Sequence, residues 1–168
     1  IKVPLKITAE SKPSLVLGRQ NQQAGDIEIT ETAGRVLLAQ QLWVDFPNSV
    51  SLSNNPQVKV TSGNLNIAKP YLAGDMEKRR LVIPIKTAST APATLSITDI
   101  FYDVGSLAAD GDVEVHVGGP AVNEVNHGRA PLFAAYDWAG SVINANIGLP
   151  DGTGGDQTLE DIIGESDL

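Results

Sequence analysis

Residues 25–32 read Gly-Asp-Ile-Glu-Ile-Thr-Glu-Thr, and this stretch decides the fold class. Apolar and polar residues alternate, so Ile27 and Ile29 share one face of an extended chain, and Asp26, Glu28 and Thr30 share the other. An amphipathic helix would need apolar residues three or four positions apart. The stretch therefore predicts a β-strand with one buried face.

The same alternation recurs along most of the chain. It predicts about nine or ten short strands separated by turn residues, and no long amphipathic helix pattern competes with them. We therefore expect an all-β fold, an antiparallel two-sheet sandwich of jelly-roll or immunoglobulin-like type, with a short helical turn at 158–163. The expected strands are 2–8, 14–17, 25–32, 41–46, 57–61, 65–67, 80–86, 94–100, 112–117 and 141–147.

The last quarter of the chain reads differently. An aromatic cluster flanked by proline begins at residue 131, and residues 148–157 form a Gly-rich joint. We expect a sandwich body over residues 1–125, with an exchangeable strand at 1–9. Residues 126–168 are expected to form an extension that packs on the body or on a neighbouring subunit.

Composition excludes several classes of protein. The 168 residues carry a net charge of −8 with a pI of about 4.6, which argues against a nucleic-acid binder because such proteins need a basic face. No apolar run approaches the roughly 18 residues of a membrane span, so we expect no membrane insertion. Cysteine is absent, which excludes disulfides and thiolate metal sites.

We expect the chain to be exported from the cell. The sequence begins at Ile1 and its only methionine is Met76, a pattern that removal of a secretory signal peptide would produce. Experimental trimming is the alternative. A composition rich in Thr, Ser, Asn, Gly and Val also favours a secreted, extracellular protein at the cell surface.

Charge is distributed unevenly along the chain. Residues 1–86 hold 11 of the 12 Lys and Arg, whereas residues 87–168 hold only Arg129 against 13 acidic residues. In a sandwich whose strands interleave, this gives a generally acidic surface. The alternative is an acidic end that meets a basic end of another copy or collects cations.

Four stretches carry a resemblance to a known kind of module. In their order they resemble β-sandwich modules of secreted and surface proteins of Gram-positive bacteria, which often precede copper amine oxidase-like (stalk) domains. The resemblance covers about 12–125 and implies fold and location but no catalytic residue. More loosely, the chain is similar to donor-strand-exchanged subunits of extracellular filaments. The stretches are 24–32, 58–65, 81–90 and 111–119.

The N-terminal stretch 2–8 is a well-patterned strand. Val3, Leu5 and Ile7 share one face, and Pro4 favours an edge position. Such a strand either completes its own sheet or adds to the open edge of another subunit. The second outcome makes Val3, Leu5 and Ile7 an assembly strand, and its head-to-tail contact need not close.

Acidic turns suggest a possible calcium site. Calcium takes six to eight oxygen ligands, which sandwich loops often supply. Asp110 and Asp112 are the first candidates. Asp99 and Asp103, which flank a turn-like stretch at 101–102, are the second. The alternative is that all four are solvated carboxylates with no metal.

Aromatic side chains offer a ligand or interface site. Trp43 alternates with Leu42 and Val44 and so faces away from them, and Tyr136 and Trp138 share a face if their segment is extended. Such rings either stack on a surface glycan or pack in the core or an interface.

No nucleophile and base stand in a recognisable arrangement, so we expect no catalytic residue and no cofactor other than the possible calcium. The expected function is that of a structural protein that self-assembles into a filament, tube or surface layer by head-to-tail strand addition. The expected partners are then other copies of the chain. The alternative is a cell-surface binding or adhesion module, cohesin-like or carbohydrate-binding, with a glycan or protein partner.

Overall fold

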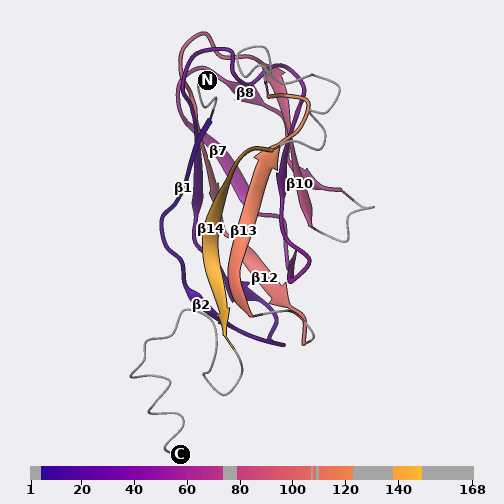
Figure 1. Cartoon of the computed structure of the whole chain (residues 1–168). Helices are drawn as coiled ribbons and strands as arrows, with labels where there is room; N and C mark the ends of the chain where they lie inside the picture. Colours follow the sequence, from indigo (N-terminus) through magenta and orange to yellow (C-terminus); the bar gives the residue numbers. More distant parts are fainter. Residues whose placement is uncertain (1–4, 74–78, 107, 109, 123–137, 149–168) are drawn as a thin grey trace, which may run out of the picture.

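The computed structural model describes residues 5–73, 79–106, 108, 110–122 and 138–148, which form β-strands and no helix. Figure 1 shows an elongated sandwich whose strands run along its length. The strands are β1 (Leu5–Ala9), β2 (Ser14–Val16), β3 (Gln22–Gln23), β4 (Ile27–Glu31), β5 (Gln41–Asp45), β6 (Val50–Leu52), β7 (Gln57–Ser62), β8 (Asn66–Ile67), β9 (Tyr71–Leu72), β10 (Arg80–Thr87), β11 (Thr94–Thr98), β12 (Phe101–Val104), β13 (Gly111–Gly118) and β14 (Trp138–Gly148).

Two large sheets form the layers of the sandwich. One has four strands in the order β1-β4-β11-β7, and the other has seven, of which six follow the order β2-β14-β13-β5-β10-β8 while β9 also pairs with β10. A small third sheet, β3-β12-β6, lies at the end of the sandwich near β2 (Figure 1). All pairs are antiparallel except β2 with β14, which is parallel.

The core lies between the two large sheets and follows the alternation of the sequence. Ile27 and Ile29 of β4 face Leu42 and Val44 of β5 across the core, and all four side chains are buried. Residues that alternate with them, such as Glu28, stay at the surface. The predicted all-β sandwich is thus confirmed.

The strand count was underestimated. The described residues form fourteen strands, and four short ones, β3, β6, β9 and β12, were not among those predicted from the sequence. The stretch 101–102 was expected to be turn-like, but it opens β12 and Tyr102 is fully buried. Two to four residues are too few to show a period, so these strands gave no signal.

The predicted extension falls partly inside the described residues. Residues 138–148 form β14, which pairs along β13 in the seven-stranded sheet. The expected helical turn at 158–163 lies outside the described residues. Among those described, no helix has the length and apolar character that a membrane span requires.

Candidate functional site

The predicted assembly strand is the outer strand of the four-stranded sheet. β1 pairs antiparallel with β4, from Leu5 opposite Glu31 to Ala9 opposite Ile27. Leu5 is buried and Ile7 is half-buried against the core, whereas Lys6 and Thr8 are exposed. The structure therefore places the strand in its own body, and Val3 lies outside the described residues.

β1 also touches the opposite layer. It runs beside β14 (Figure 1), and Ile7 packs over Gly140 of that strand. A Cβ atom at Gly140 would lie 2.6 Å from Ile7 Cδ1, so the glycine makes room for the isoleucine. The seat of β1 is thus a groove between β4 and β14, and both walls belong to other parts of the chain.

Residues 10–13 form a hinge that carries the chain from one layer to the other. Glu10 N donates to Asp26 O at 2.9 Å, and Asn146 N donates to Pro13 O at 2.9 Å. Between these bonds the Ser11 carbonyl lies directly against Gly25. After Pro13 the chain enters β2, which joins the seven-stranded sheet.

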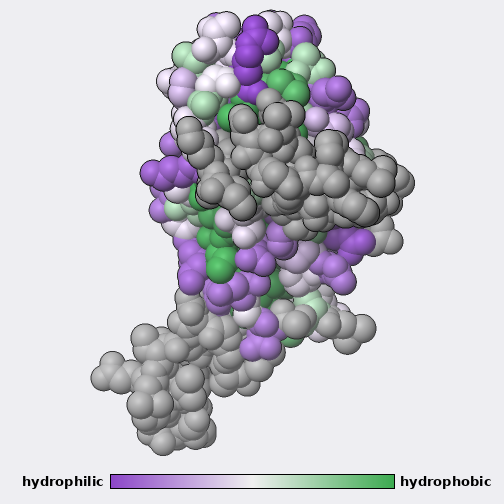
Figure 2. All heavy atoms as spheres, turned by 45° about the horizontal axis from the view of Figure 1, so that its top comes forward, coloured by the Kyte–Doolittle hydropathy of each residue, from purple (hydrophilic) through white to green (hydrophobic). Residues whose placement is uncertain are grey.

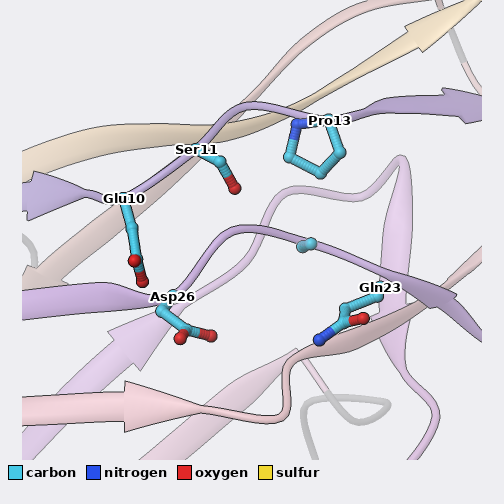
Figure 3. A pocket seen from close by; sticks show the side chains of 6 residues that line it. Glu10, Ser11, Pro13, Gln23 and Asp26 are labelled. Atoms are coloured by element: carbon cyan, nitrogen blue, oxygen red, sulfur yellow. The ribbon is translucent and has the colours of Figure 1, made fainter.

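Two carboxyl groups meet at the start of this hinge. Figure 3 shows the side chain of Glu10 extending toward Asp26 beside an open cavity of about 290 Å³. Desolvation by burial raises the pKa of Asp26, and the charge and hydrogen bond of Glu10 and the charge of Asp99 raise it further. The sequence analysis missed this pair because only the register of β1 on β4 brings the two residues together.

The candidate calcium ligands Asp103 and Asp112 each accept hydrogen bonds from the chain itself. Asp103 accepts hydrogen bonds from Asn21 N at 2.8 Å and Ser53 Oγ at 2.6 Å, so it braces the end of the sandwich. Asp112 accepts from Asn146 Nδ2 at 2.7 Å.

Asp99 lies in a turn with φ of 57°, and Asp110 is exposed just before β13. The described part of the chain contains no group of three or more His, Asp or Glu residues that could hold a metal ion. Calcium binding stays a prediction.

Trp43 lies half-buried on the outward face of β5. The Arg80 guanidinium carbon stands 4.1 Å from the centre of its ring, and Arg80 also donates two 2.8 Å hydrogen bonds to the Asp45 carboxylate. Trp43 Nε1 donates to Gln41 Oε1 at 3.1 Å. One face of the indole is therefore covered by a cation of the same chain.

The other predicted aromatic residues are only partly described. Trp138 is opposite Gly118 in the pairing of β14 with β13, and Gly118 is opposite Trp43 on β5. Tyr136 lies outside the described residues. The backbone thus places both tryptophans at the same level, on the two strands that flank β13.

The surface displays few large apolar side chains. Tyr71 is the one large hydrophobic residue of the described part that is exposed, at 44%. On the face seen in Figure 2, hydrophobic residues reach the surface in small groups between hydrophilic ones. Within the described ranges, a partner would therefore find unpaired backbone groups at the sheet edges rather than a broad apolar patch.

Comparisons with known proteins give remote likenesses. No protein-family model and no curated protein matches the chain. Among solved structures, a non-cellulosomal cohesin from the hyperthermophilic archaeon Archaeoglobus fulgidus is 10% identical with a TM-score of 0.38, over 86% of this chain and 90% of that one.

Two further structures are similar over 86% of this chain. BslA, described as a bacterial hydrophobin, is 11% identical over 97% of its own length with a TM-score of 0.39. The sixth cohesin of scaffoldin B from Acetivibrio cellulolyticus, solved in complex with a Cel5 dockerin mutant, is 10% identical over 98% of its length with a TM-score of 0.32. Likeness at this level does not show a shared function.

Proposed function

We propose that the chain is a non-enzymatic structural protein of the cell exterior that self-assembles head to tail by exchange of β1 into a filament, tube or surface layer. The observation that carries this proposal is the position of β1. It is an edge strand on a four-residue hinge, and its seat is built from β4 and β14. Another copy of β1 fits that seat with the same contacts.

The energetics of exchange favour assembly at high protein concentration. A buried leucine such as Leu5 contributes about 1.5–3 kcal/mol, which holds β1 in place but is small enough to be lost transiently. The exchanged strand regains the same pairing with β4 in its new host, so exchange costs little at equilibrium. Pro13 keeps the hinge extended and disfavours a compact turn there.

Engineered cysteines test the exchange directly, because the chain has none of its own. Lys6 and Thr30 are opposite each other in the β1–β4 pairing. Opposite residues of antiparallel strands have Cα atoms about 4.5–5.5 Å apart, within reach of a disulfide. We mix a Lys6→Cys chain with a Thr30→Cys chain, oxidise mildly, and expect a cross-linked product on a non-reducing gel.

A matched pair controls for random collision. Thr94 is opposite Thr30 in the β11–β4 pairing, which stays within one body. A mixture of Thr30→Cys and Thr94→Cys chains should therefore give no cross-linked product.

The Lys6→Cys/Thr30→Cys double variant should give a ladder of covalent multimers, and negative-stain images of the wild-type protein should show filaments, tubes or layers. The proposal would be overturned if the double variant formed disulfides only within single chains at protein concentrations where the chains associate.

A second candidate is a surface binding module that uses the outward face around Trp43. Trp, Tyr and Arg are the residue types that dominate binding hot spots, and Trp43, Tyr71 and Arg80 lie together there. Tyr71 and Trp43 are both opposite Val82 of β10. Because Arg80 covers one face of the indole, this arrangement supports a protein partner better than a stacked glycan.

A glycan array tests the two kinds of partner for this second candidate. Hits that disappear in Trp43→Ala but persist in Phe101→Ala, a change in the small sheet, would support the glycan. An array without hits, together with cross-linked multimers in the cysteine assay, would favour assembly instead.

A further inference from the structure

We propose that the Glu10–Asp26 carboxyl pair is a pH-sensitive latch that holds β1 in its seat in acid and loosens it near neutrality. This proposal rests on the proposed function in one respect, since the strand that the latch controls is the strand that exchanges. The latch itself is a property of a single chain.

The position of the pair gives it leverage over β1. Ala9 is the last residue of the strand, and the Glu10 N–H bond to Asp26 O extends the β1–β4 pairing by one further rung. Beyond that rung the chain leaves the sheet through the hinge. Repulsion between the two side chains therefore acts at the hinge end of β1.

Two cavities border the pair. Among the described residues that line them are Ser11, Gln23, Ser96 and Glu28, and none of the described lining residues is a Lys, Arg or His. Asp99, in the turn that precedes β12, adds to the negative potential at Asp26.

The lysine of the hinge lies near a different carboxylate, with Lys12 Nζ 3.7 Å from Asp112 Oδ1 on β13. Glu28 of β4 and Asp99 of the turn after β11 add further negative charge beside the pair.

The sign of the pH dependence follows from the raised pKa of Asp26. A carboxyl group whose pKa is higher in the seated form than in the released form binds a proton more tightly when seated. Its contribution to seating is complete below the ordinary value of about 3.9 and is lost as the pH rises through the raised value. When the Glu10 and Asp26 carboxyl groups are both ionised they repel each other, and the hydrogen bond from Glu10 N to Asp26 O opens more often.

Hydrogen exchange of the β1 amides tests the latch in the full chain. Protection factors, which remove the intrinsic pH dependence of exchange, are compared at about pH 4 and about pH 7. Because the seated form binds a proton at Asp26 more tightly than the released form does, we expect protection of β1 to fall severalfold at the higher pH. Asp26→Asn and Glu10→Gln should each abolish this difference.

Glu28→Gln is the matched control, because it removes a carboxylate of the same strand that is opposite Thr8 rather than Glu10. It should keep the pH dependence of the wild type. Equal protection of β1 at both pH values in the wild type, or the same dependence in Asp26→Asn, would overturn the latch. If protection of β1 depends on pH but the cysteine assay gives no cross-linked product between chains, the latch is supported and strand exchange is overturned. Failure of the latch and failure of the proposed function can therefore be told apart.

Discussion

The Tyr102 hydroxyl donates a 2.8 Å hydrogen bond to Asn144 Oδ1 inside the sandwich. Asn144 Nδ2 in turn donates to Gly25 O at 3.1 Å, and Gly25 N donates to Asn144 O at 2.9 Å. Both side chains are fully buried. The bonds tie the small sheet to β14 and to Gly25, which lies against the hinge, so the core and the hinge share one polar network.

Tyr102→Phe should destabilise the fold. It removes the donor and leaves Asn144 Oδ1 buried without this partner, which costs about 1–3 kcal/mol. Chemical denaturation measures the loss. Tyr71→Phe is the control, because its hydroxyl is bonded only at the exposed surface and its loss should cost less than about 0.5 kcal/mol. Equal effects of the two changes would show that the buried bond is not the stabilising one.

The same tyrosine predicts a loss of stability in alkali. Burial raises the pKa of Tyr102 above its usual range, and the bond to Asn144 offsets this only in part. The unfolded tyrosine ionises near pH 10, so its contribution to stability is complete below about pH 10 and falls as the pH rises further. Melting temperatures above about pH 10 should therefore fall more steeply for the wild type than for Tyr102→Phe. Parallel curves would contradict this assignment.

Gly25→Ala should loosen the hinge. A Cβ at Gly25 would overlap the Ser11 carbonyl, which is backbone and cannot rotate away. We expect a loss of about 1–3 kcal/mol, as for other overpacked sites, together with more cross-linked product in the Lys6→Cys and Thr30→Cys mixture. Gly105→Ala is the control, because nothing lies within 4 Å of its added carbon. If Gly25→Ala left the amount of cross-linked product unchanged, the packing of the hinge would not control strand exchange.

Alternation predicted the long strands because each has five or more residues that alternate between the core and the surface. Ile27 and Ile29 were placed inward correctly for this reason. The same alternation also places Glu31 on the inward face of β4. Its charge gave no sign that the side chain would be buried there. Tyr102 was missed because its strand is only four residues long.

The site was less predictable than the fold. The apolar face of β1 could be read from Leu5 and Ile7, but no sequence pattern says whether such a strand seats in its own body. Contacts such as Glu10 with Asp26 depend on the register between strands that are distant in sequence. Register is set by the packed core as a whole, which a single sequence does not display.

Glu31 is a buried carboxylate of β4 that lies opposite Leu5 of β1. It accepts hydrogen bonds from Leu37 N at 2.8 Å, Ala93 N at 3.0 Å and Ser89 Oγ at 2.5 Å, and so joins two loops at one end of the sandwich.

Glu31→Gln replaces one acceptor with an NH₂ group that faces these donors, and we expect a loss of about 1–3 kcal/mol in chemical denaturation. Glu28→Gln, exposed on the same strand, should change stability by less than about 0.5 kcal/mol. If Glu31→Gln proves as mild as Glu28→Gln, the two loops are held by their backbone bonds, such as Glu31 N to Ala93 O at 2.9 Å, and the carboxylate is dispensable.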